Sequence, residues 1–330
     1  MSYSRRRHLL GVAGAVMVVG AIASVAVAAT TAKNPTFNLK ALKGTITADG
    51  SSTVGPYTTA AAELFSRAGA KNVRITVGIS GTGGGFERFC RGETDLSDAS
   101  RPMKIKEAVL CRDNNVTGWR AFTVANDALT VVDNKSNTWA TCLTLAELKN
   151  IWQPGSKVDN WKDVRAGFPD EKLKLFGPGT DSGTFEYFTE VINGKSKASR
   201  SDYSASEDDN VLVQGVAGEK GGMGYFGFSY FEENQDKLRA LQIQNPKTGT
   251  CVTPSIATTQ NNTYKPLARP LFIYAKGASF QRKEVQAFID YIFDNEAAIA
   301  KRARFVPLTK AQLKRAQENF YAAIKQANRV

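Results

Sequence analysis

Three tracts rich in glycine, serine and threonine constrain the fold most, because each follows a strand-forming stretch and precedes a helical pattern. They run from Asp49 to Tyr57, from Ser80 to Phe86 and from Phe176 to Phe185. Backbone N–H groups in the first turn of a helix have no intrahelical acceptor, and the helix dipole adds a positive field. The three tracts therefore predict a fold that gathers hydrogen-bond donors around an anion.

The alternation of strands with helices is typical of an α/β protein. A chain of 330 residues can bury a full core and is long enough for two lobes. Each tract would lie at the carboxyl end of a strand, where open α/β sheets bind ligands. We expect strands at 45–48, 73–79, 96–99, 128–132, 174–176 and 266–275. We expect helices at 59–68, 85–91, 183–192, 211–217, 281–293 and 309–326, and a capping box (Thr144 with Glu147) on one ending near Trp152.

The N-terminus has the pattern of a secretory signal peptide. Three arginines, Arg5 to Arg7, precede an uncharged run from Leu9 to Ala29 that contains Ala26-Val27-Ala28. We predict a signal peptide over residues 1–28 and a polar linker over 29–43, hence a periplasmic or secreted protein. An uncleaved membrane anchor is the alternative, because the run is about long enough to span a bilayer. Export by the general or the twin-arginine route stays open.

The four cysteines agree with an oxidising compartment. Three pairings are possible, and we favour Cys90 with Cys111 and Cys142 with Cys251, since this choice closes one short loop. Four buried thiols are the alternative. No Cys-x-x-Cys spacing occurs, which argues against a structural zinc site.

Histidine is nearly absent, which limits the enzymatic possibilities. The only one, His8, lies in the segment that we expect to be removed. A Ser-His-Asp triad, a histidine base and most zinc hydrolase sites are therefore excluded.

The net charge of +12 suits a protein that binds anions or acidic surfaces. Basic residues concentrate after Lys265, where helical spacing favours a solvated surface over membrane or partner contact. No nucleic-acid-binding motif accompanies the charge.

Taken together, the tracts resemble the PstS family of periplasmic phosphate-binding proteins, over nearly all of the chain after the signal peptide. The resemblance rests on 49–53, 79–86, 95–102, 179–185 and 269–272. It implies a two-lobed, type II periplasmic-binding-protein-like α/β fold, with three-layer α/β/α lobes and a two-segment hinge. Lobe I would comprise 44–124 and 264–330, and lobe II 125–263. The resemblance further implies a monomeric receptor without cofactor or catalysis, which closes on inorganic phosphate and delivers it to the membrane permease of an ABC transporter.

The resemblance also implies which residues bind phosphate, through hydroxyls, backbone amides and one guanidinium. The candidates are Ser51, Ser52, Thr53, Ser80, Thr82 and Arg101 from the first lobe, and Asp181, Ser182, Gly183 and Thr184 from the second.

The chain departs from the best-known family members, which place an aspartate where Arg101 stands and an arginine near Pro178. Selectivity for phosphate over sulfate is then open, because hydrogen phosphate carries a proton that needs an acceptor. Asp181 is our candidate acceptor, with a helix N-cap as its alternative role. For Arg101 the alternative is an ion pair with Asp98 or Asp95. Ordinary turn chemistry is the alternative for the first two tracts.

Three rival functions remain at this point. The chain could bind another tetrahedral oxyanion such as sulfate. It could be a secreted phosphohydrolase with Ser52 or Ser182 as nucleophile, which the lack of histidine disfavours. It could also be a surface protein that adheres through its basic C-terminal helices.

Overall fold

The computed structural model describes residues 36–327. The predicted signal peptide and most of the predicted linker lie outside the described residues. The end of that linker is folded: Leu39–Ala41 forms a 3₁₀ turn, η1. Phe37, Leu39 and Leu42 pack partly against an apolar core, so the folded domain begins earlier than the predicted tether allows.

One mixed sheet of nine strands runs through this part of the chain, in the order β2-β1-β3-β12-β4-β8-β6-β7, with β9 paired to β4. A separate three-stranded sheet has the order β11-β10-β5. The strands are β1 (Lys43–Gly50), β2 (Asn72–Gly78), β3 (Leu96–Ala99), β4 (Arg120–Asn134), β5 (Cys142–Leu143), β6 (Lys174–Pro178), β7 (Ser204–Ser206), β8 (Gly222–Gly227), β9 (Leu238–Ala240), β10 (Gln242–Gln244), β11 (Cys251–Val252) and β12 (Ala268–Ala275).

Helices connect these strands as expected for an α/β fold. The α-helices are α1 (Gly55–Arg67), α2 (Gly81–Cys90), α3 (Ile105–Asp113), α4 (Leu145–Trp152), α5 (Gly183–Phe188), α6 (Asp209–Gly218), α7 (Phe228–Glu232), α8 (Ile256–Gln260), α9 (Lys283–Asp294), α10 (Glu296–Arg302) and α11 (Lys310–Ala327). Shorter turns are η2 (Trp161–Asp163), a π-helical turn η3 (Thr189–Asn193) that continues α5, and η4 (Gly277–Gln281).

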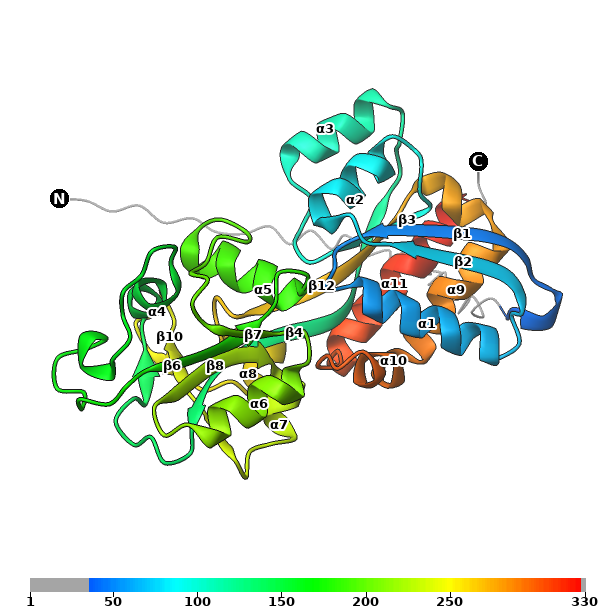
Figure 1. Cartoon of the computed structure of the whole chain (residues 1–330). Helices are drawn as coiled ribbons and strands as arrows, with labels where there is room; N and C mark the ends of the chain where they lie inside the picture. The colour runs from blue at the N-terminus through cyan, green and yellow to red at the C-terminus, as the bar shows by residue number, and fades with distance from the viewer. Residues whose placement is uncertain (1–35, 328–330) are drawn as a thin grey trace, which may run out of the picture. The chain divides into compact units, whose positions relative to one another are not determined.

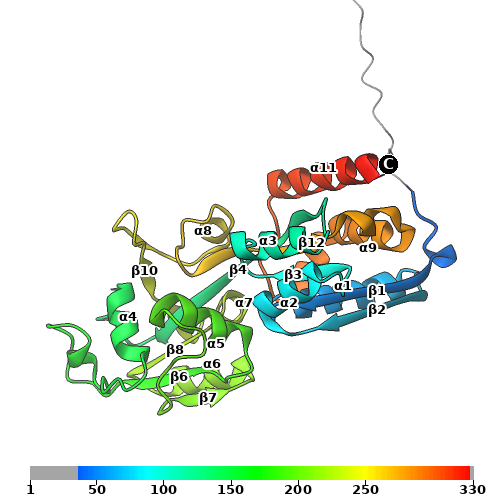
Figure 2. The same ribbon diagram turned by 90° about the horizontal axis from the view of Figure 1, so that it is seen from above.

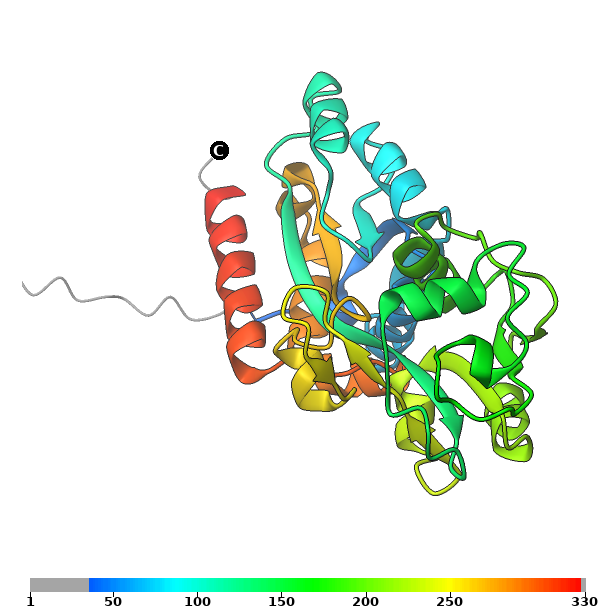
Figure 3. The same ribbon diagram turned by 90° about the vertical axis from the view of Figure 1, so that its left-hand side faces the viewer.

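The hydrophobic cores define two lobes. We call the half built from β1–β3, α1–α3 and α9–α11 the first lobe, and the half built from β5–β11 and α4–α8 the second lobe. In Figure 1 the first lobe combines the blue and cyan segments with the orange and red ones, whereas the second is green and yellow. In Figure 2 α11 lies alongside α9, and Figure 3 shows it beside the long strand β4. The first lobe is therefore built from two segments that are far apart in the sequence.

Strands β4 and β12 cross between the lobes. Phe122 of β4 belongs to the core of the first lobe and Val132 to that of the second. Strand β12 crosses in the opposite direction, from Ala268 in the second core to Ile273 in the first. The two strands pair antiparallel, with a register shift between Leu271 and Phe272. This matches the predicted two-segment hinge; the exact lobe boundaries stay a prediction.

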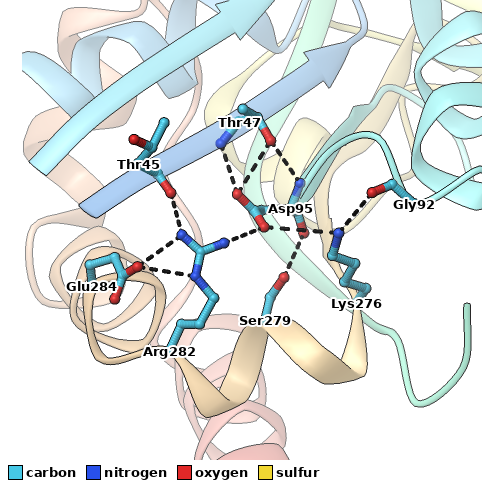
Figure 4. Close-up of polar contacts among 8 residues, drawn as sticks. All are labelled: Thr45, Thr47, Gly92, Asp95, Lys276, Ser279, Arg282 and Glu284. Atoms are coloured by element: carbon cyan, nitrogen blue, oxygen red, sulfur yellow. Dashed lines mark hydrogen bonds and ion pairs between the residues drawn. The ribbon is translucent and has the colours of Figure 1, made fainter.

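Asp95 joins the two sequence segments of the first lobe (Figure 4). Its carboxylate accepts a hydrogen bond from Thr47 N at 3.0 Å and pairs with Arg282 at 2.6 Å. Lys276 approaches the same carboxylate at 3.9 Å, and Ser279 donates its hydroxyl to the Asp95 carbonyl at 3.3 Å. Strand β1 and the segment around η4 are thus fastened to one residue at the start of β3.

Both predicted disulfides are confirmed. Cys90 of α2 pairs with Cys111 of α3, and Cys142 of β5 pairs with Cys251 of β11. The first bond holds two first-lobe helices together, and the second closes the small sheet of the second lobe.

Most predicted elements are present, with different bounds. The strand at 96–99 and the Thr144–Glu147 capping box are confirmed. Helix α5 is shorter than predicted, because the helix after Phe188 widens into η3. Helices α3 and α10 were not predicted. None of the helices between residues 36 and 327 is both long enough and apolar enough to cross a bilayer.

Candidate functional site

The first tract forms a tight turn between β1 and α1. Ser51 N donates to the Asp98 carbonyl at 2.9 Å, which ties the turn to the end of β3. The Ser51 hydroxyl accepts from Thr53 N at 3.2 Å and from Val54 N at 3.4 Å. Asp98 is fully buried behind this turn, and burial raises its pKa to about 7 although Thr58 donates to it at 2.8 Å. The turn is therefore fixed from behind.

The second tract begins α2 at Gly81. The Thr82 hydroxyl lies 3.0 Å from the Ser100 hydroxyl and accepts from Ser100 N at 3.3 Å, so the start of α2 meets the end of β3 there. Ser80 points elsewhere: its backbone N–H and its hydroxyl both donate to Asp49. Ser80 thus holds the start of α2 in place and does not face the cavity.

Arg101 follows β3 and is held by Glu107 of α3. The two side chains form a bidentate pair at 2.8 and 2.7 Å, and this hydrogen bonding raises the pKa of Arg101. Burial pushes the pKa of Glu107 upward, but its bonds to Arg101 and to Lys104 N outweigh burial, so the pKa lies below the usual range. The suggested ion pair with Asp98 or Asp95 is therefore wrong, since the partner is Glu107.

The third tract places Ser182, not Asp181, at the N-cap of α5. The Ser182 hydroxyl accepts from Thr184 N at 3.1 Å and from Phe185 N at 3.4 Å. Asp181 is exposed and lies outside the cavity lining, with its backbone N–H bonded to Glu207. The alternative of an Asp181 N-cap is wrong, and the structure gives Asp181 no position from which to accept a proton inside the cavity.

Arg269, which sequence reasoning did not place at the site, projects from the crossing strand β12. Its guanidinium donates to the Thr53 hydroxyl at 3.0 Å and to Asp127 of β4 at 3.1 Å. It also lies 3.5 Å from the centre of the Tyr187 ring. Burial raises the pKa of Asp127, and the adjacent guanidinium opposes that shift. The sequence signal that could have identified Arg269 is its charge, because the strand around it is otherwise apolar.

These parts surround one cavity of about 460 Å³ between the two lobes. Three cationic and two acidic side chains face it together with hydroxyl groups and glycines. The lining consists of Ser51, Thr53, Gly81, Thr82, Gly83, Ser100, Arg101, Lys104, Gly183, Glu186, Tyr187, Glu190, Val191, Ser196 and Arg269.

The structure gathers half of the predicted site residues at this cavity. Those that line it are Ser51, Thr53, Thr82, Arg101 and Gly183. The others lie just behind or beside it: Ser52, Ser80, Asp181, Ser182 and Thr184. Besides Arg269, the prediction missed Ser100 and Lys104, which follow β3, and Glu186 and Glu190, which follow the third tract.

The two lobes touch at the base of the cavity. A Cβ atom on Gly183 would lie 2.8 Å from Thr53 N, so the start of α5 packs against the first tract with no room for a side chain. Guanidinium, ammonium, hydroxyl and amide groups from both lobes and the hinge thus converge. Such a donor set can hold a desolvated oxyanion.

Known proteins resemble this chain closely. A family model described as a PBP superfamily domain matches residues 28–296. The protein SphX of Synechococcus elongatus is 46% identical over 288 residues, covering 87% of this chain and 84% of that protein. The phosphate-binding protein PstS of Staphylococcus epidermidis is 36% identical over 278 residues, covering 83% and 82%. The crystal structure of a possible phosphate-binding protein from Planctomyces limnophilus matches with a TM-score of 0.82 at 47% identity, covering 86% and 99%.

Proposed function

The chain belongs to the PBP superfamily, with relatives named PstS and SphX, and we propose that it is an exported receptor for inorganic phosphate. Phosphate would bind in the cavity between the lobes and be delivered to an ABC transporter permease. The mechanism is recognition without a chemical step.

The convergence of Arg101 and Arg269 on one cavity carries this proposal. Arg101 comes from the first lobe and Arg269 from the hinge, and each is held by a carboxylate that fixes its orientation. The hydroxyls of Thr53 and Thr82 lie on the same surface. A charge-assisted hydrogen bond contributes only about 1.5–3 kcal/mol net, so a tight site needs many such donors at once. Donors from both lobes and the hinge meet this requirement when the lobes close.

Sulfate is the main competitor as ligand. Both anions are tetrahedral, and they differ at neutral pH by the proton on hydrogen phosphate. Two carboxylates, Glu186 and Glu190, line the cavity on the second lobe. Their negative charge opposes sulfate, which stays a dianion at neutral pH, more than phosphate, part of which is then the monoanion, so this lining favours phosphate.

Calorimetric titration of the purified protein, stripped of bound phosphate, tests the proposal. We expect phosphate to bind and sulfate to bind far more weakly at pH 7. Arg269→Gln and Arg101→Gln should each weaken phosphate binding by roughly 100-fold, because each removes a charged donor. Arg112→Gln is the matched control, since Arg112 is exposed and pairs with Asp113 away from the cavity. Equal affinity for both anions would leave only a general oxyanion receptor, and hydrolysis of a phosphomonoester would contradict binding without chemistry.

A further inference from the structure

Ser52 makes a direct contact between the lobes. Its hydroxyl donates to Glu186 Oε2 of α5 at 3.1 Å, across 134 positions of sequence. Ser52 does not line the cavity, whereas Glu186 does. The hydroxyl that the sequence assigned to the ligand is therefore used to join the first lobe to the second.

Glu186 is held in place from within its own lobe. Its other oxygen, Oε1, pairs with Lys197 at 3.1 Å. Lys197 has a φ of 63°, a left-handed conformation that is uncommon for a lysine, and its N–H donates to the Thr189 hydroxyl at 2.7 Å. The carboxylate is thus oriented before it meets Ser52, and it can release Ser52 without losing its cationic partner.

The contact lies beside a point where the two lobes pack closely, with no room for a side chain. Thr53, next to Ser52, abuts Gly183 and accepts a hydrogen bond from Arg269. Opening the cavity must separate Thr53 from Gly183, and the neighbouring Ser52–Glu186 bond would break in the same movement. The Ser52–Glu186 bond therefore contributes to stability only when the lobes are closed.

We propose that Glu186 is a positioning residue that stabilises the closed form through Ser52 and so sets the balance between open and closed lobes. The inference rests on the proposed function for its effect on affinity, but not for its effect on the ligand-free protein. A ligand that binds only the closed form has an apparent affinity reduced by the fraction that is closed. Weakening this contact should therefore lower both the closed population and the affinity for phosphate.

The negative charge of Glu186 changes phosphate affinity in the opposite direction from its contact with Ser52, and the experiment must distinguish the two effects. A carboxylate facing the cavity repels an anion, so removing it should strengthen phosphate binding. Glu190 provides the matched control: it lies one helical turn further along, lines the same cavity and carries the same charge. No hydrogen bond or ion pair of its side chain is found among residues 36–327. Glu190→Ala removes this repulsion and leaves the Ser52 contact intact, whereas Glu186→Ala removes both.

Small-angle X-ray scattering in phosphate-free buffer measures the lobe balance without any ligand. We expect Glu186→Ala to increase the radius of gyration relative to the unmodified protein, and Glu190→Ala to leave it unchanged. Glu186→Gln keeps an acceptor oxygen for Ser52 and should remain close to the unmodified protein.

Calorimetry with inorganic phosphate supplies the second readout. Glu186→Ala should weaken binding about tenfold, Glu186→Gln less than threefold, and Glu190→Ala should leave binding unchanged or tighten it. Opposite signs for the two alanine variants would support the proposal. Tighter binding by both, or a Glu186→Ala radius of gyration equal to that of the unmodified protein, would overturn it. If no variant binds phosphate, the proposed function fails, while the scattering data still decide the role of Glu186.

Discussion

The two sides of the cavity are built differently. On the first lobe each donor loop is backed by an acidic residue: the Asp49 carboxylate holds Ser80, the Asp98 backbone carbonyl accepts from Ser51 N, and the Glu107 carboxylate holds Arg101. On the second lobe the tract is capped by its own Ser182, and the carboxylate that bonds its backbone, Glu207 at Asp181 N, is exposed to solvent. A loop held by buried groups keeps its donors in place without ligand, whereas a loop held by its own cap and an exposed side chain can adjust. The comparison indicates that the first lobe is the preorganised half and that the second lobe closes onto it.

The largest effect that tests this comparison concerns Asp98. Its pKa of about 7 in the folded protein lies well above the ordinary value for an aspartate, so the folded state binds the proton more tightly. Its stabilising contribution is complete below pH 4 and is lost as the pH rises through 7. One pKa unit corresponds to about 1.4 kcal/mol. Between pH 4 and pH 8 the unmodified protein should therefore lose about 4 kcal/mol of unfolding free energy that the Asp98→Asn variant does not lose. Urea unfolding at both pH values measures this; identical pH slopes would show that Asp98 is not buried as a neutral acid.

The two disulfides provide a matched pair, one in each lobe. Replacing Cys90 and Cys111 by serine should lower the unfolding free energy by about 3 kcal/mol in the chain-entropy model, and should also weaken phosphate binding. The reason is that α2 and α3 carry Thr82 and Glu107, the partner of Arg101. Replacing Cys142 and Cys251 should lower stability without changing affinity at temperatures where the protein stays folded. Equal affinities for both variants would contradict the idea that the first lobe must be rigid.

Gly85 tests how closely the first lobe is packed. A Cβ there would lie 2.4 Å from Gly50 Cα and 2.8 Å from the Asp49 carbonyl oxygen, which are backbone atoms that cannot move aside easily. We expect Gly85→Ala to lower the unfolding free energy by roughly 2–3 kcal/mol, measured by thermal unfolding. Gly218→Ala is the control, because nothing lies within 4 Å of a Cβ at that position.

Gly183 gives the smallest predicted effect, and it falls on binding. The Cβ of Gly183→Ala would meet Thr53 of the other lobe, so the substitution opposes closure and leaves each lobe intact. We expect phosphate affinity to fall about tenfold, equivalent to about 1.4 kcal/mol, with an unchanged melting temperature in the absence of phosphate. A lower melting temperature would mean that the contact with Thr53 matters for folding rather than for closure.

Much of the fold could be predicted from the sequence because its signals are local. The strand Leu96–Ala99 and the capping box of Thr144 are set by neighbouring residues. Strand β4 was predicted too short because Asn126 and Asp127 interrupt its apolar pattern. Asn126 is buried at the crossing point and the partly buried Asp127 binds Arg269 there, so a polar signal that suggests a loop marks the hinge instead.

The site could be predicted only in part, because its remaining members depend on distant partners. The tracts identified Thr53, Thr82 and Gly183 through their own composition. Arg269 could not be assigned in this way, since it reaches Thr53 across 216 positions. The same limit applies to Ser52, because its hydroxyl bonds Glu186 across 134 positions and no local pattern indicates that contact.

The Asp95 network has a consequence for the order in which the protein is made. Strands β1 to β3 emerge from the ribosome early, but Arg282, which binds Asp95, follows 187 positions later. At roughly 5–20 residues per second, the nascent chain waits about ten seconds or more for the helices that cover its first core. The half that synthesis begins first is therefore completed last, and a chain that terminates before α9 leaves that half unfinished.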